Sequence, residues 1–319
     1  MRSRLSLALL ILLATLVAGA LIVSLLTFWR AVRPPRISVP LRPADVGLEV
    51  RDITIDAEDG VPLHGWLIPR PGTPSVVILH GYPAEKAEML PIAATLAQHF
   101  SVLLMDLRYF GRSGGGATTF GVHERGDLRR AVDILMAQGT SSVGVFGLSL
   151  GGAVAIMTAV EDPRIRAIAA YAPFSDLKTL GRELHDWLGL AKYPFVELMT
   201  LWGRLFLGID LGVASPAMAA RHLTTPVLLI ASREDELIRF HHAEALQAAL
   251  RGNPAAEFLV MSHGRHGELP ADVGSRLARF FRAHLTSTKP DAKPPGSESL
   301  PASRESPSPE PRRAPGRPR

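Results

Sequence analysis

Near the middle of the chain, residues 147–152 read Gly-Leu-Ser-Leu-Gly-Gly. An apolar run, 142–146, comes before this stretch, and a helix-compatible run of small apolar residues, 153–160, follows it. A serine on a sharp turn between a strand and a helix needs glycine two positions before and two positions after it, because the neighbouring backbones approach closely. The pattern therefore predicts a strand–turn–helix elbow that presents Ser149 as a nucleophile.

The N-terminal end of the chain differs from the rest. Residues 5–29 carry no charge and are mostly Leu, Ile, Val and Ala, and as a helix this run is long enough to cross a bilayer. A cleaved signal peptide is the alternative, but its apolar core is usually only about 7–15 residues long. We therefore expect a membrane protein with one uncleaved N-terminal anchor, residues 1–30. Arginines flank the run on both sides, so the side of the membrane stays open, cytoplasmic or extracytoplasmic.

The remaining chain divides by composition. A Pro-rich linker is expected over 31–47, a folded domain over 48–285, and a disordered Pro/Ser/Arg-rich tail over 286–319. The net charge of +5 comes from the two ends, because residues 1–42 contain six Arg and no acidic residue and the tail has seven Lys or Arg against four Asp or Glu. The mildly acidic middle gives no support for a nucleic-acid partner.

Cysteine and metal chemistry are also not indicated. The chain has no Cys, which excludes disulfides, thiolate zinc sites and a cysteine nucleophile. No spacing of His, Asp and Glu predicts a metal site, and we expect no cofactor. Oligomeric state is left undetermined by the sequence.

Within the domain, the pattern predicts a hairpin followed by alternating strands and helices. The alternation favours a mostly parallel sheet with helices on both faces and a site beyond the carboxyl ends of the strands. The expected strands are 50–55, 63–68, 76–79, 102–105, 142–146, 165–171, 226–231 and 257–261, and the helices beside the elbow helix are 86–99, 122–138, 241–250 and 272–285.

The interval 172–225 breaks this rhythm. It contains no clear strand and is rich in large apolar residues. We interpret it as a helical cap over the site, in which Phe174, Trp187 and Trp202 are expected to bind substrate. Some of these aromatic residues would also serve as ordinary core.

Two loops downstream of Ser149 offer partners for its hydroxyl. A serine needs a base to take its proton, usually a histidine oriented by a carboxylate. The loop after strand 226–231 contains three acidic residues, and the loop after strand 257–261 contains two histidines. The preferred partners are Asp235 and His266, and the alternatives are Glu234, Glu236 and His263.

The oxyanion of such a reaction needs backbone donors. The N–H of Leu150, at the start of the elbow helix, is the first candidate. The second is the N–H of Tyr82, in the His-Gly-Tyr-Pro loop 80–83 that follows the first parallel strand. We expect His80 to support this loop rather than to bind a ligand.

Together these pieces resemble the α/β-hydrolase family, in particular its membrane-anchored S33 serine aminopeptidase-like or BEM46-like branch. The matching segments are 80–82, 106–113 and 147–152, with Asp235 and His266, and the resemblance covers about residues 50–285. It implies an α/β-hydrolase fold with an eight-stranded sheet, one of whose strands is antiparallel. Tyr109-Phe110 replaces the Gly and variable residue that are common in the family's Asp-x-Arg-Gly-x-Gly-x-Ser loop, so a changed loop shape is expected.

The expected function is a serine hydrolase that cleaves a carboxylic ester or thioester through an acyl-enzyme. An aromatic cap and an adjacent membrane favour a lipophilic acyl substrate, with lipid among the candidates. Two alternatives stay open: a non-catalytic binding module, and a serine aminopeptidase. An aminopeptidase would need acidic residues of the cap to hold a free amine, and the cap offers Asp176, Glu183, Asp186, Glu197 and Asp210.

Overall fold

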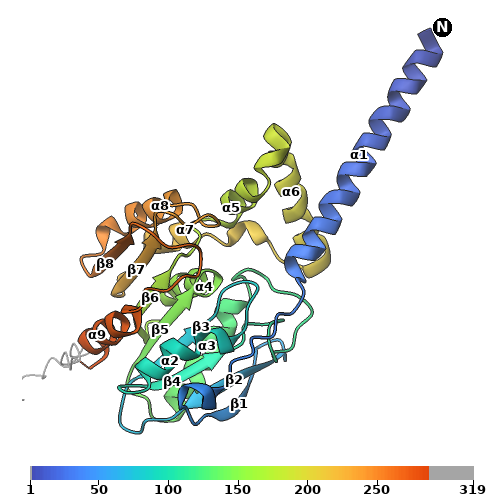
Figure 1. Ribbon diagram of the computed structural model, residues 1–319. Coiled ribbons are helices and arrows are strands. Elements are labelled where there is room, and N and C mark those ends of the chain that lie inside the picture. Colours follow the sequence, from blue (N-terminus) through green and yellow to red (C-terminus); the bar gives the residue numbers. More distant parts are fainter. Residues whose placement is uncertain (1, 287–319) are drawn as a thin grey trace, which may run out of the picture. The chain divides into compact units, whose positions relative to one another are not determined.

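The computed structural model describes residues 2–286, and within them it contains one eight-stranded sheet (Figure 1). Its strands are β1 Arg51–Asp56, β2 Pro62–Ile68, β3 Ser75–Leu79, β4 Ser101–Met105, β5 Val143–Leu148, β6 Ile165–Tyr171, β7 Val227–Ser232 and β8 Ala256–Met261. Their spatial order is β1-β2-β4-β3-β5-β6-β7-β8. Only β2 runs against the others in this sheet. The predicted α/β-hydrolase sheet is therefore confirmed, and the strand bounds agree with the predicted ones to within two residues.

Helices cover both faces of the sheet and create two apolar cores. On one face lie α2 (Leu90–Leu96) and α9 (Val273–Leu285), and on the other lie α3 (Glu124–Ala137), α4 (Leu150–Glu161) and α8 (His241–Ala249). Consecutive residues of β3 alternate between the cores, Val76 with α2 and α9, Val77 with α3 and α4. Burial on both faces explains why this strand is a continuous apolar run.

One predicted helix begins differently from the expectation. The segment 86–99 starts as a 3₁₀ turn, Lys86–Met89, and only then becomes α2. The Asp106 carboxylate, just after β4, accepts hydrogen bonds from the backbone N–H of Lys86 at 2.8 Å and from its ammonium group at 2.5 Å. Both side chains are buried, so this ion pair fixes the turn and delays the regular helix.

The segment predicted as a cap, 172–225, is helical but belongs to two layers. Its outer part consists of α5 (Leu177–Leu184) and α6 (Lys192–Trp202), and Asp176 caps α5 by accepting the Thr179 N–H at 2.9 Å. The later helix α7 (Pro216–Ala220) packs instead against α4 and α8, in the sheet core. The cap layer therefore ends before α7.

The N-terminal apolar run forms one helix, α1 (Arg2–Val32), which projects past α6 in Figure 1. By length and composition, residues 6–32 could cross a membrane, although a signal sequence near an N-terminus meets the same criteria. The last turns of α1 are packed against the protein. Phe28 and Val32 are buried, and the indole N–H of Trp202 in α6 donates to the Ser24 hydroxyl at 3.0 Å.

The predicted linker, 31–47, begins inside α1, ends in a 3₁₀ turn at Pro43–Val46, and is tied to the domain between them. The Tyr109 hydroxyl donates to the Pro34 carbonyl at 2.7 Å, and the Val39 N–H donates to the Glu85 carboxylate at 2.6 Å. Tyr109 has a φ of 75°, in the region that favours the glycine common at this position in the family. Its hydroxyl gives this tyrosine a contact that glycine cannot make. The predicted tail lies outside the described residues, apart from its first residue.

Candidate active site

Ser149 stands on a strained turn between β5 and α4. Its φ of 50° and ψ of −111° are unusual for a residue with a side chain. A Cβ on Gly147 would lie 2.2 Å from the carbonyl carbon of Gly151, and a Cβ on Gly151 would lie 2.6 Å from the Leu79 oxygen. Glycine is therefore required on both sides of the serine, as the sequence pattern predicts.

Ser149, His266 and Asp235 form one hydrogen-bonded relay. Nε2 of His266 lies 3.1 Å from Oγ of Ser149, and Nδ1 lies 2.8 Å from Oδ2 of Asp235. Since a carboxylate only accepts hydrogen bonds, Nδ1 carries the proton and Nε2 is free to accept the serine hydroxyl. The three predicted residues are brought together from the ends of three parallel strands.

The second oxygen of Asp235 is held by the backbone. Its Oδ1 accepts the N–H groups of Leu237 at 3.0 Å and Ile238 at 2.7 Å. The carboxylate is therefore fixed in the plane that directs Oδ2 at the imidazole. This arrangement favours a single orientation of the His266 ring.

The alternative acidic and histidine residues lie elsewhere. Glu234 pairs with His263 at 2.9 Å, and both side chains are exposed. Glu236 accepts the backbone N–H of His266 at 3.1 Å rather than its ring. Glu236 thus supports the histidine loop, and Asp235 alone of the three acidic residues reaches the imidazole.

The two proposed oxyanion donors lie beside Ser149. Leu150 is the first residue of α4, so its N–H has no acceptor within the helix. The Gly81 backbone approaches so closely that a Cβ there would lie 3.4 Å from the Ser149 Cβ, which brings the adjacent Tyr82 to the same place. The Tyr82 ring packs on Phe110, and burial raises the pKa of its phenol.

His80 holds this loop from inside the protein, as expected. Its ring is fully buried; Nδ1 donates to the Gly81 carbonyl at 2.7 Å and Nε2 accepts the Leu107 N–H at 3.0 Å. Both nitrogens are satisfied by the neutral ring, and burial lowers the pKa of His80. Both ring nitrogens of His80 are therefore used to hold the loop.

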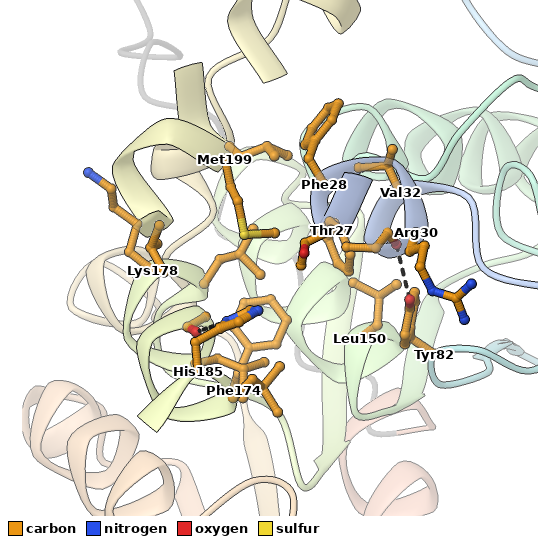
Figure 2. A pocket seen from close by; sticks show the side chains of 18 of the residues that line it. Thr27, Phe28, Arg30, Val32, Tyr82, Leu150, Phe174, Lys178, His185 and Met199 are labelled. Atoms are coloured by element: carbon orange, nitrogen blue, oxygen red, sulfur yellow. Dashed lines mark hydrogen bonds between the residues drawn. The ribbon is translucent and has the colours of Figure 1, made fainter. Parts of the chain in front are cut away.

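A cavity of about 640 Å³ opens above Ser149. Figure 2 shows Phe174, Lys178 and His185 on its cap side, and Thr27, Phe28 and Val32 of α1 on the opposite side. The lining is mostly apolar, and none of its described residues is acidic. The remaining residues that line the cavity are Arg30, Ala31, Pro34, Pro35, Tyr82, Phe120, Leu150, Leu177, Leu180, Gly181, Leu184, Val196, Met199, Thr200, Leu211, Leu237 and Ile238.

Two of the three predicted substrate-binding aromatics do not line this cavity. Phe174 does, but Trp187 is 73% exposed on the outer surface of the cap, and Trp202 packs against α1 through Ser24. The prediction failed for them because it placed large apolar residues inside the cap by type alone. Most of the apolar lining is aliphatic.

The residues of α1 that line the cavity were missed. Their apolar character was accounted for by a membrane span, so the sequence carried no separate signal for them. Their position depends on how the end of α1 packs against Tyr82 and the cap. The Tyr82 hydroxyl donates to the Ala31 carbonyl at 3.0 Å (dashed in Figure 2).

The five cap acidic residues are engaged in other contacts. Asp176 caps α5, Glu183 contacts His241 and His242, and the other three form ion pairs with basic residues. Those three pairs are Asp186 with Lys192 and Arg239, Glu197 with Lys178 and Arg182, and Asp210 with Arg204. None of the five lines the described cavity, so no carboxylate is positioned there to receive a free amine.

Glu183, His241 and His242 bring three metal-ligand groups together, within 4.8 Å of one another. Nδ1 of His242 accepts the Ser175 N–H at 3.1 Å, so its proton is on Nε2, which donates to Glu183 at 3.1 Å. Burial lowers the pKa of His242. In this state neither nitrogen of the ring is free for a metal, and the cluster acts as a contact between α5 and α8.

Comparison with known proteins agrees with this fold. A family model described as alpha/beta hydrolase fold matches residues 74–195. An esterase from Pyrococcus furiosus superposes with a TM-score of 0.66 at 29% identity, over 80% of this chain and 98% of that one. The alpha/beta hydrolase domain-containing protein WAV2 of Arabidopsis thaliana is 27% identical over 72% of this chain and 76% of its own length. The thiohydrolase aneE of Aspergillus aculeatus is 35% identical over a shorter stretch, 39% of this chain and 41% of its own length.

The family model covers β3 to β6, the elbow and the loop that carries Tyr82. The matching esterase is similar over nearly its whole length, which supports a hydrolase of the esterase type. With the sheet order and the elbow on β5 described, the chain has the α/β-hydrolase fold.

Proposed function

We propose that the protein is a serine hydrolase that cleaves a carboxylic ester or thioester of a lipophilic acyl group. The observation that carries this proposal is the relay from Asp235 through His266 to Ser149, with distances of 2.8 and 3.1 Å. The esterase and thiohydrolase among the similar proteins support both bond types. The relay also favours an enzyme over a non-catalytic binding module.

The geometry supports a two-step reaction. Nε2 of His266 takes the Ser149 proton as Oγ attacks the acyl carbon, and the Tyr82 and Leu150 N–H groups bind the resulting oxyanion. His266 then gives that proton to the leaving alcohol or thiol, and the acyl group stays on Ser149. In the second step a water molecule loses a proton to His266 and attacks the acyl carbon. The bond between this carbon and Oγ then breaks, His266 returns the proton to Oγ, and the carboxylic acid leaves with Ser149 restored.

The cavity lining supports a lipophilic substrate and argues against an aminopeptidase. Its volume of about 640 Å³ lies within the range of cavities that take drug-sized ligands. An aminopeptidase would need a carboxylate for the substrate's amine, and the lining contains Arg30 and Lys178 but no acidic residue among those described. A small acyl substrate, lipid included, is the proposed partner.

We also propose that α1 remains attached and anchors the protein in a membrane. Ser24, Phe28 and Val32 are buried against the cap and the domain, whereas most of α1 before them is exposed and apolar. Cleavage after the apolar run would remove packed residues, which favours an anchor over a signal peptide.

The test is hydrolysis of p-nitrophenyl esters from C2 to C16 by the full chain in detergent micelles. Wild type is compared with Ser149→Ala and His266→Ala, and folding is checked by thermal melting. We expect both variants to lose turnover by about 10⁴-fold or more. Folded wild type that neither turns over any ester nor reacts with a serine-directed fluorophosphonate would overturn the proposal.

A further inference from the structure

We propose that α1 is part of the substrate site and that the cavity takes acyl esters directly from the bilayer that α1 enters. This inference rests on the proposed hydrolase function and adds to it the source of the substrate and the role of the anchor. It is carried by three observations: the cavity wall contributed by α1, an exposed apolar surface on the cap, and the depth at which the cavity lies along α1.

The first observation is the wall itself. Thr27, Phe28, Ala31 and Val32 of α1 line the cavity that also contains Ser149 (Figure 2). Two hydrogen bonds hold this end of the helix in place. The Ala31 carbonyl accepts the Tyr82 hydroxyl at 3.0 Å, and the Val32 carbonyl accepts the Thr118 N–H at 2.9 Å. Because Tyr82 also offers the oxyanion donor, α1 is joined directly to the reacting part of the site.

The second observation is an apolar surface on the cap, which we call the cap face. It consists of exposed side chains of α5, α6 and the turns beside them: Leu184, Trp187, Leu190, Tyr193, Leu201, Leu205 and Phe206. Seven large apolar side chains exposed within residues 184–206 indicate a surface that is covered by a partner or a membrane.

The bilayer is the occupant that fits the cap face. Phe206 contacts Trp29 of α1, with ring centroids 5.5 Å apart, so the cap face continues into the exposed apolar surface of α1. In Figure 1, α6 lies beside α1, on the side toward which the apolar helix projects. A helix that enters the bilayer therefore brings the cap face to the membrane surface.

The third observation is depth. Trp29 and Arg30 end the uncharged run of α1, and residues of these types are enriched at the membrane–water interface. The cavity is lined by Thr27 and Phe28 on the bilayer side of that level and by Ala31 and Val32 on the other. The ester bonds of membrane lipids lie at this interface, between the acyl chains and the headgroups. An acyl chain can therefore pass between α1 and the cap toward Ser149 without leaving an apolar environment.

The contribution of α1 to the cavity is tested with a substitution that fills the cavity from this helix. Thr27→Trp adds a large ring to the cavity from α1, and Val23→Trp, on an exposed position of the same helix, is the matched control. We expect Thr27→Trp to lower kcat/KM for C12–C16 esters relative to C4 esters at least tenfold, with the wild-type profile kept by Val23→Trp. An unchanged acyl-length profile in Thr27→Trp would overturn the inference.

Binding measured without turnover separates this inference from the proposed function. In a Ser149→Ala background, binding of a fluorescent C18 fatty acid should weaken at least tenfold on adding Thr27→Trp and stay unchanged on adding Val23→Trp. Absence of turnover in wild type with this binding pattern intact would reject the hydrolase function alone. Equal binding of the fatty acid by the Thr27→Trp and Val23→Trp variants would reject the proposal that α1 forms part of the substrate site.

Access from the bilayer is tested with reconstituted protein. Leu190→Glu and Leu205→Glu place charges on the cap face, and Val260→Glu places one on an exposed position of β8. The readout is the rate on a long-chain ester embedded in phosphatidylcholine vesicles, divided by the rate on a soluble C4 ester. We expect this ratio to fall at least tenfold in the cap-face variants and not in Val260→Glu. A ratio that stays at the wild-type value in both cap-face variants would reject substrate access from the bilayer.

Discussion

Replacing Asp235 with Asn should prevent His266 from acting as a base while leaving the positions of the three side chains unchanged. Oδ1 of Asp235 accepts two backbone N–H groups, at 3.0 and 2.7 Å. The oxygen of an asparagine must occupy that place, because its NH₂ group cannot accept hydrogen bonds. The NH₂ group then faces Nδ1 of His266, which must become an acceptor. The proton of the imidazole moves to Nε2, where it faces the Ser149 hydroxyl and can no longer take its proton.

The expected magnitude follows from this change of tautomer. Loss of the correct tautomer in a serine triad lowers kcat by about 10⁴-fold, which corresponds to about 5.5 kcal/mol of transition-state stabilisation. We expect kcat to fall by that factor at pH 7 with little change in KM, because the cavity wall is untouched. The melting temperature should stay close to that of wild type, since the size and both outer contacts of the side chain are kept.

The assay is steady-state hydrolysis of a p-nitrophenyl ester of the preferred length. Glu234→Gln is the matched control, because this neighbouring acidic residue is exposed and pairs only with His263 among the described contacts. It should keep activity within about threefold. Activity of Asp235→Asn within tenfold of wild type, or an equal loss in Glu234→Gln, would refute the assignment of Asp235 as the residue that orients His266.

Three further predictions concern stability. Gly147→Ala should lower the free energy of unfolding by about 3 kcal/mol or prevent folding, measured by urea denaturation, because its Cβ would lie 2.2 Å from a backbone carbon. Lys86→Met should cost about 3–5 kcal/mol in the same assay, because it leaves the buried Asp106 carboxylate unpaired. The melting temperature of wild type should fall as pH drops below about 6.5, since burial lowers the pKa of His80 and the unfolded chain then binds more protons than the folded one.

The two substitutions have a control, and each of the three predictions has a contradicting outcome. Gly252→Ala, where no atom lies within 4 Å of the added Cβ, should change stability by less than about 1 kcal/mol, and an equal effect at Gly147 would contradict the steric argument. Asp106→Asn combined with Lys86→Met should recover part of the loss, and no recovery would argue against a penalty from unpaired charge. A melting temperature that is constant from pH 7 to 5 would contradict the neutral state of His80.

The sheet and the relay could be predicted from sequence because their signals are local. Each strand that is buried on both faces is a short apolar run. Ser149 follows such a run directly, and Asp235 and His266 lie in the loops after β7 and β8. Asp235 was preferred to Glu234 and Glu236, and the backbone contacts of Leu237 and Ile238 give the physical reason for its role. Glycine at 147 and 151 was required by close approach within one turn.

The cavity could not be predicted in the same way, because its walls are set by packing between distant segments. Trp187 and Phe174 are both large apolar residues of one segment, yet one is exposed and the other is buried beside Ser149. Composition does not record which face of a cap helix turns inward. Likewise, Phe28 is one apolar residue in a long apolar run, and only its contact with the cap distinguishes it from the exposed residues before it.

Hydrogen bonds restrain the orientation of the domain relative to α1. The carbonyls of Val32 and Pro34 accept hydrogen bonds from Thr118 and Tyr109, and Val39 is held by Glu85. A domain joined by a flexible linker would reorient independently of its anchor. Here a change in the direction of the α1 axis would also reorient the opening of the cavity. A helix adjusts its tilt to the thickness of the surrounding bilayer. With α1 as the proposed anchor, bilayer thickness would change the angle at which Ser149 meets its substrate, and lipid composition would act on the reaction rate without any lipid binding at a regulatory site.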